Sequence, residues 1–307
     1  MGGVLVGFAV ILTVIAAGYL LGRLNIVTPT GVVVLGKVAF YAATPALLFT
    51  VMAKADIHVL LSPVALVGGL SLVAAALVYL ALSRLFFRRP VAETTLGMAT
   101  ASYVNANNIG LPVAIYVIGD AQYAAPVLLI QLLFAAPALL SVLDLSTRGR
   151  LRPLDIVLMP VRNPIIVAVV LGLLVAILGI QLPDAVVAPF DIVGGAAVPL
   201  MLLAFGASLR GNRPLAAGSD RTGVIVATAV KSLAMPVIAW IVGALVLHMD
   251  PMHLYAAVVF AALPTAQNMY NYAQRFEVAV ATARDTVLLT TVVSLPVIFA
   301  IAALLAH

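Results

Sequence analysis

The stretch Ala101–Gly119, "ASYVNANNIGLPVAIYVIG", interrupts a chain that otherwise consists of one apolar segment after another. The interruption consists of three asparagines, a glycine and a proline: Asn105, Asn107, Asn108, Gly110 and Pro112. Glycine and proline weaken or break a helix. In hydrocarbon, a broken helix persists only where protein or a water-filled cavity satisfies its backbone groups. The stretch therefore predicts a functional break inside a membrane helix.

Composition places the chain in the membrane. Of its 307 residues, 64% are apolar and only 9% are charged, which is far from the mix of a soluble domain. Long apolar runs without alternation favour helices over a β-barrel. The sequence thus predicts an all-α integral membrane protein. No cysteine is present and the four histidines are scattered, so we expect neither a metal cluster nor a cofactor. The first apolar run, from Val4, has no positive leader and is interpreted as a retained helix.

Apolar runs between charged or Pro/Gly-marked breaks predict ten spans. Their approximate bounds are 4–22, 30–52, 63–83, 92–118, 122–144, 163–181, 185–209, 222–247, 252–274 and 278–305.

The distribution of basic residues predicts the orientation of these spans. Every second connection carries them: Arg23; Arg84, Arg88 and Arg89; Arg148, Arg150, Arg152 and Arg162; Arg210, Arg213 and Arg221; and Arg275. The opposite connections hold only Lys54. The positive-inside bias then puts both termini outside the plasma (inner) membrane. The net charge of +5 reports this orientation, and we do not expect nucleic-acid binding.

The central connection, residues 146–162, separates two five-helix halves, residues 1–145 and 163–307, and an odd number of spans forces the halves into opposite orientations. Their sequences echo each other: a charged residue precedes a proline by eight positions in both "KVAFYAATPALLF" and "DIVGGAAVPLMLL". A second echo, 159 residues apart, maps Asn105 onto Pro264 in "ALPTAQNMYNYAQRF". The ninth span is therefore predicted to be broken like the fourth. Paired interruptions in inverted halves are typical of a transporter's binding site.

The two breaks are expected to open near Asn107–Pro112 and Pro264–Asn271 and to cross at mid-membrane. Half-helix N-termini there would offer free N–H groups and positive partial charge, which suit a carboxylate. Six amides accompany them: Asn105, Asn107, Asn108, Gln267, Asn268 and Asn271. The alternative is that these amides only join helices to one another.

Ionisable residues within the spans are a second group of candidates. Lys231 lies about nine residues into the eighth span, roughly 14 Å deep at 1.5 Å per residue. It is interpreted as a counter-charge for an anionic substrate, a fixed stand-in for a coupling cation, or a member of a structural ion pair. In the tenth span, Asp285 is a candidate ligand for a coupling proton or cation, whereas Arg284 is expected to reach the cytoplasmic surface.

Enzyme signatures are missing from the chain. It contains no HExxH, GxSxG, Walker or DDxxD motif. The sequence argues against a protease, a transferase and an ATP-driven pump.

Several strings together resemble the auxin efflux carrier family in its shorter prokaryotic form, which includes malonate-transporter-like members. They are "GYLLGRLNIVTPTGVVVLGKVAFYAATPALLF", "NNIGLPV" with "VIGD", "RNPIIVAVVLGLL", "AAVPLMLLAFGASL", "VKSLAMP", "LPTAQNMYNYAQRF" and "TVLLTTVVSLPV". The resemblance covers nearly the whole chain, and the order and spacing of the strings make it specific. Two departures are the absence of a long cytoplasmic loop and the Arg284–Asp285 pair.

This resemblance implies ten helices in two inverted repeats, related to bile-acid symporters and sodium–proton antiporters. Helices 1, 2, 6 and 7 would form a scaffold that often forms a homodimer, and helices 3–5 and 8–10 a transport unit moving in an elevator fashion. Crossed helices 4 and 9 would hold the substrate. The corresponding positions here are Asn105–Pro112, Pro264–Asn271 and the basic residue Lys231.

The sequence therefore predicts a secondary carrier for a small organic anion, a carboxylate, with membrane lipid as its surroundings. A sodium-coupled symporter of the bile-acid type and a membrane sensor with a vestigial pocket remain alternatives. Coupling to protons or to sodium is left open.

Overall fold

The computed structural model describes residues 2–54, 63–149, 158, 161–210, 215 and 220–305. Regular elements in these residues are helical, and α denotes an α-helix and η a π-helical or 3-10 turn. The first half contains α1 (Gly2–Arg23), α2 (Pro29–Val38), η1 (Ala39–Ala43), α3 (Thr44–Ala53), α5 (Pro63–Phe86), α6 (Val91–Thr100), η2 (Ala106–Gly110), α7 (Leu111–Val113), η3 (Ala114–Ile118), η4 (Ala121–Tyr123), α8 (Ala124–Ile130), η5 (Gln131–Ala135) and α9 (Ala136–Arg148). The second half contains α11 (Pro164–Ile177), α12 (Asp184–Gly195), α13 (Ala197–Ser208), α14 (Arg221–Ala229), η6 (Val230–Ala234), α15 (Met235–Trp240), η7 (Ile241–Val246), α16 (Pro251–Ala262), α17 (Asn268–Phe276) and α18 (Val280–Leu305).

Six continuous helical segments are long and apolar enough to cross a membrane: Pro29–Ala53, Pro63–Phe86, Ala121–Thr147, Asp184–Ser208, Arg221–Val246 and Val280–Leu305. Shorter apolar helices occur at Ala9–Arg23, Ala106–Ile118, Pro164–Ile177 and Pro251–Ala262. The all-α, multi-pass membrane class is thereby confirmed. The arrangement as ten spans in two inverted repeats stays a prediction. Most of the predicted linker 146–162 lies outside the described residues, as do Arg150, Arg152 and Arg213.

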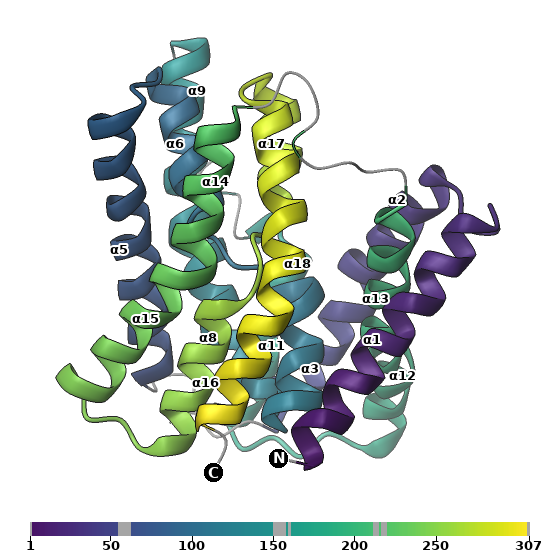
Figure 1. The fold of residues 1–307 in the computed structure, drawn as a ribbon. Coiled ribbons are helices and arrows are strands. Elements are labelled where there is room, and N and C mark those ends of the chain that lie inside the picture. The colour runs from purple at the N-terminus through teal and green to yellow at the C-terminus, as the bar shows by residue number, and fades with distance from the viewer. Residues whose placement is uncertain are drawn as a thin grey trace. The chain divides into compact units, whose positions relative to one another are not determined.

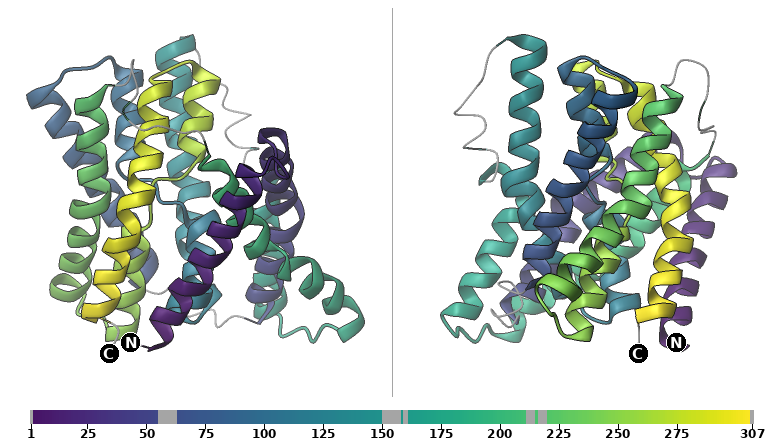
Figure 2. Two further views of the ribbon diagram at one scale, coloured as in Figure 1. Left: turned by 45° about the vertical axis from the view of Figure 1, so that its right-hand side comes forward. Right: turned by 60° about the vertical axis from the view of Figure 1, so that its left-hand side comes forward.

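The chain divides into two compact units, which are described separately. Unit 1 comprises residues 1–61, 107–126 and 158–212. Its helices approach closely through glycines, as membrane helices often do. In Figure 1 and the left view of Figure 2, α1 runs along α13, where Gly206 faces the backbone of α1. Gly172 of α11 and Gly194 of α12 both face the backbone of α3.

Unit 2 comprises residues 62–106, 127–157 and 213–307. Helix α16 packs against α5, α15 and α18, and α6 packs against α5 and α9 (Figure 1). Helix α17 contacts α18 and α6. Unit 2 thus brings both predicted broken helices, through α6 and α16, into one packed body.

Three π-helical turns have a common cause in the sequence. In each of the turns η1, η5 and η6, a proline follows two residues after the last residue of the turn; these prolines are Pro45, Pro137 and Pro236. A proline has no N–H and its ring clashes with the carbonyl four residues earlier, so the helix widens there. Such wide turns are frequent at functional sites. Lys231 lies on η6 and Gln131 begins η5.

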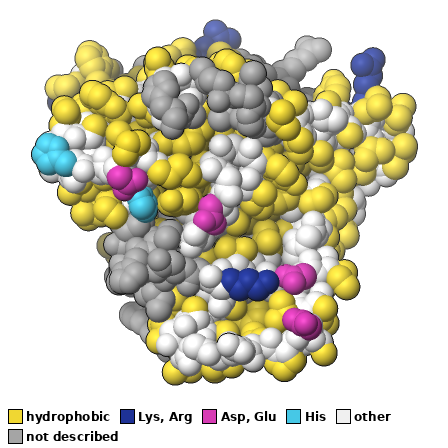
Figure 3. Space-filling model, turned by 90° about the horizontal axis from the view of Figure 1, so that it is seen from below, with side chains coloured by type: hydrophobic (Ala, Val, Ile, Leu, Met, Phe, Trp, Pro, Cys, Tyr) yellow, Lys and Arg dark blue, Asp and Glu magenta, His cyan; other side chains and the backbone are white. Residues whose placement is uncertain are grey.

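Hydrophobic side chains make up most of the surface in the view of Figure 3, with a few charged and histidine side chains among them. Many large apolar side chains are exposed, including Val73 and Leu77 of α5 and Ile192 of α12. Contact of this apolar surface with the hydrocarbon of a bilayer is not unfavourable, whereas its exposure to water would be. The exposed surface is that of a protein embedded in lipid.

Candidate functional site

The two interrupted segments of unit 2 pair with each other where their helices stop. Helix α6 ends at Thr100, α16 ends at Ala262, and Val104 and Thr265 form an isolated antiparallel bridge. Asn105 N donates to Pro264 O at 2.8 Å, and Ala266 N donates to Tyr103 O at 3.0 Å. Each break therefore satisfies backbone groups that the other leaves open, which is what hydrocarbon surroundings require.

The position of the first break differs from the expected one. Backbone that is not helical occupies residues 101–105, whereas Asn107–Pro112, expected to be open, lies in η2 and α7. The reason is that Pro112 sits in the first turn of α7, where a missing N–H removes no bond that the helix needs. In the ninth span the non-helical residues are 263–267, at the start of the expected range.

Buried threonines hold the two breaks together. Thr265 Oγ1 donates to Thr100 O at 2.6 Å, and Thr265 N donates to Thr290 Oγ1 at 3.1 Å. All three residues are buried. All three were missed as site residues. For Thr290 a signal was present, because Thr282, Thr286, Thr290 and Ser294 recur every four residues along an apolar helix. That spacing puts hydroxyls on one face of α18.

Thr265→Val is expected to lower the free energy of unfolding by about 1–3 kcal/mol, because it leaves the buried carbonyl of Thr100 without its bond. Thermal unfolding of the purified protein measures this loss. Thr291→Val is the matched control, since the described hydrogen bond of Thr291 Oγ1 goes to a carbonyl of its own helix, that of Val287. Equal losses in both variants would show that Thr265 does not join the breaks.

The predicted amides differ in exposure. Asn105 is buried, Asn107 and Asn108 are half-buried, and Asn107 Nδ2 donates to Asn108 Oδ1 at 3.0 Å. In unit 2, Gln267 and Asn268 are half-buried and Asn271 is exposed. Amides that serve only to join helices would be buried against them, so partial exposure favours a binding role.

Helix α17 begins among these amides without a side-chain cap on its N-terminus, at Gln267. Met269 N and Tyr270 N donate to Ala266 O and Gln267 O at 3.0 and 3.1 Å, so it is the positive end of the helix dipole that favours a negative ligand here. Gly110 and Pro112 are buried in unit 1, and Pro264 is buried in unit 2. The structure brings Asn105 and Pro264 together, and it places Asn107, Asn108, Gly110 and Pro112 in a different unit from Gln267, Asn268 and Asn271.

Lys231 is fully buried in unit 2, with 0% of its surface exposed. Its Nζ donates to Ala261 O at 2.6 Å. Ala261 is in the last turn of α16, where carbonyls lack helical partners and carry negative partial charge. Among the described residues, no carboxylate forms an ion pair with Lys231. The structural ion pair suggested as one interpretation is therefore not seen in this part of the chain.

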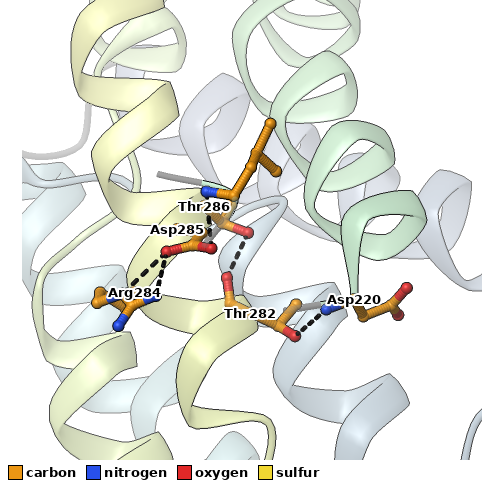
Figure 4. A network of polar contacts seen from close by, with 6 residues as sticks. Asp220, Thr282, Arg284, Asp285 and Thr286 are labelled. Carbon is orange, nitrogen blue, oxygen red and sulfur yellow. Dashed lines mark hydrogen bonds and ion pairs between the residues drawn. The ribbon is translucent and has the colours of Figure 1, made fainter. Parts of the chain in front are cut away.

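Asp285 is also fully buried, but both of its carboxylate oxygens accept hydrogen bonds (Figure 4). Arg284 donates to Asp285 Oδ1 through Nε at 2.9 Å and Nη2 at 2.8 Å, and Leu215 N donates to Oδ2 at 2.9 Å. The carboxylate thus attaches a loop residue to α18. Its candidate role as an ion ligand stays a prediction.

A second ion pair, which the sequence analysis did not predict, joins Asp220, the residue before α14, to Arg89, the residue before Pro90. Arg89 Nη2 and Nε contact the two carboxylate oxygens of Asp220 at 2.9 and 3.0 Å. Asp220 also caps α14 through Gly223 N, and its own N donates to Thr282 Oγ1 at 3.4 Å (Figure 4). No local pattern announces a pair 131 residues apart. Within the described residues, no cluster of three or more His, Cys, Asp or Glu side chains suggests a metal site.

Comparison with known proteins gives the family. Residues 4–143 and 154–301 match the family described as membrane transport protein. The chain belongs to this family. A protein of Rhizobium meliloti (strain 1021) named "Putative malonate transporter" is 29% identical over 266 residues, which cover 83% of this chain and 81% of the relative. The resemblance to auxin efflux carriers is confirmed.

Membership in the membrane transport protein family supports a transporter rather than an enzyme. In a membrane transport protein, paired breaks with half-exposed amides are the expected place for substrate. The residues that the comparison covers include both breaks and Lys231.

Proposed function

We propose that this chain is a secondary transporter that carries a small carboxylate across the plasma (inner) membrane and binds it at the paired breaks. The observation that carries the proposal is the uncapped start of α17, next to the half-buried amides of Gln267 and Asn268 and the joint between Asn105 and Pro264. A helix N-terminus attracts an anion by roughly 0.3–1 kcal/mol near a surface and more where it is partly buried. The amides supply donors that fix orientation.

The charge balance of unit 2 supports an anionic substrate. Asp285, the buried carboxylate among this unit's described ion pairs, is matched by Arg284. Lys231 adds a buried amine without a carboxylate partner among the described residues. The relative's name mentions malonate, a dicarboxylate, which makes malonate the first compound to test.

Uptake by the purified protein in phospholipid vesicles tests the proposal. We expect radiolabelled malonate or succinate to accumulate and unlabelled carboxylates to compete, whereas choline, a cation of similar size, does not. Competition by choline would contradict an anion carrier. Binding of carboxylates without uptake would indicate a sensor instead of a carrier.

The orientation can be tested because the chain has no cysteine. We expect Thr147→Cys, at the end of α9, to react with an impermeant maleimide only after cells are opened. Gln181→Cys, before α12, should react in intact cells. The reverse labelling pattern would invert the proposed topology, in which both termini lie outside.

We further propose an elevator mechanism, in which the crossing of helices 4 and 9 moves relative to helices 2 and 7 of a scaffold that forms a homodimer. The scaffold is α1–α3 with α11–α13, and Pro45 and Pro199 mark its fixed wall. A disulfide cross-link between a cysteine introduced in the crossing and one introduced in the scaffold should arrest uptake reversibly. Full turnover with that disulfide formed would instead require a smaller gating motion.

A further inference from the structure

The broken end of α16 places negative partial charge within the membrane. The last carbonyls of a helix have no partners in their own helix and carry the negative end of its dipole. Such a group of carbonyl oxygens would hold a cation such as sodium. In this chain the amine of Lys231 occupies that place, 2.6 Å from Ala261 O and fully buried.

Among the described residues, the amine of Lys231 is the only basic group at the end of α16. Turn η6 packs against α5, α14, α15, α16 and α18. The titratable or charged groups of these helices are Tyr79 and Arg84 on α5, Arg221 on α14, His253 and Tyr255 on α16, and Arg284 and Asp285 on α18. Helix α15 has none. None of them forms a described hydrogen bond or ion pair with Lys231, and Asp285 is already bonded to Arg284 and Leu215.

A small cavity in unit 2 is lined in part by Ala261, the residue whose carbonyl accepts the hydrogen bond from Lys231. It has a volume of about 10 Å³, and its lining includes Ser71, Val104, Gln131, Met235, Phe260 and Ala261. This is close to the smallest volume that holds one water. Gln131 Nε2 is buried there without a hydrogen-bond partner in the described part of the chain.

We propose that Lys231 is the coupling group of the transporter: its amine takes the place of a bound metal cation at the broken end of α16, so that transport is coupled to protons and not to sodium. The amine gains a proton on the side where substrate is loaded and becomes an ammonium, and the proton leaves to water on the other side after the substrate. One proton and one substrate cross together, and the unloaded carrier returns with a neutral amine. This inference rests on the proposed carboxylate transport.

The proton flux of the unmodified protein is the first test. Vesicles containing the protein and the pH-sensitive dye pyranine receive external malonate. We expect the lumen to acidify as malonate enters, and an inward proton gradient to raise accumulation at least tenfold. Replacing sodium by potassium should change nothing. Uptake with a constant internal pH, or uptake that requires sodium, would overturn the proposal while leaving carboxylate transport intact. Absence of any uptake would refute the proposed function itself.

Variants then assign the coupling to Lys231. Lys231→Gln and Lys231→Met should lose at least tenfold in gradient-driven uptake and should show no acidification. Lys37→Gln is the matched control, because Lys37 is also a lysine within a membrane span but is exposed in unit 1. It should retain both signals. Proton-driven uptake that is unchanged in either Lys231 variant would contradict the assignment. If both variants fail to fold, the flux of the unmodified protein still decides between protons and sodium.

Discussion

Gly206→Ala is expected to destabilise the protein by more than about 3 kcal/mol, at or above the upper end of what overpacking usually costs. A Cβ at position 206 would overlap the carbonyl oxygen of Ile15 and would lie 2.9 Å from both Ile15 C and Tyr19 N. These are backbone atoms of α1, so no side-chain rotation relieves the overlap. The two helices would have to separate along their whole contact. Loss of the monodisperse peak in size-exclusion chromatography, together with a lower Tm, measures the effect.

Gly36→Ala is the matched control for this substitution. Gly36 is in α2, and a Cβ at this position would meet no atom within 4 Å. Alanine is a better helix former than glycine by roughly 0.5–1 kcal/mol, so this variant should be as stable as the parent or slightly more stable. A Gly206→Ala protein with an unchanged Tm would mean that α1 and α13 do not approach as closely as the structure shows.

The helical class could be predicted from the sequence because lipid imposes a strong constraint. A membrane helix needs about 20 apolar residues, and hardly any other structure satisfies its backbone. The segment Pro63–Phe86 therefore matches the expected span at 63–83 to within a few residues. The wide turns before Pro45, Pro137 and Pro236 were not predicted, because a proline permits a kink, a break or a π-turn, and only packing selects among them.

The candidate site was predicted in its residue types but not in its geometry. The pairing of the two breaks was expected from the repeat, yet the first break lies at residues 101–105 and not at 107–112. Where a helix opens depends on which backbone groups find partners across the fold, here Pro264 O and Thr265 Oγ1. The partner of Lys231 is a backbone carbonyl, which no side-chain motif encodes. Contacts of this kind become visible only in three dimensions.

Asn268→Ala is expected to reduce malonate uptake by at least about tenfold while changing the free energy of unfolding by less than about 0.5 kcal/mol. A hydrogen bond to a charged ligand contributes roughly 1.5–3 kcal/mol, and 1.4 kcal/mol corresponds to a factor of ten. Asn268 is half-buried and starts α17, where alanine is compatible with the helix. Removal of this amide should therefore weaken ligand binding more than it destabilises the fold. Initial uptake rates, normalised to reconstituted protein, and Tm in the same preparation measure the two effects.

Gln274→Ala is the control, because Gln274 is an exposed amide of the same helix and bonds only Tyr270 OH among the described contacts. It should transport normally. If Asn268→Ala instead lowers the Tm and keeps its transport rate per folded molecule, the amide joins helices. The binding site would then have to be sought away from the start of α17, because an uncapped helix end without its amides lacks the donors that orient a carboxylate.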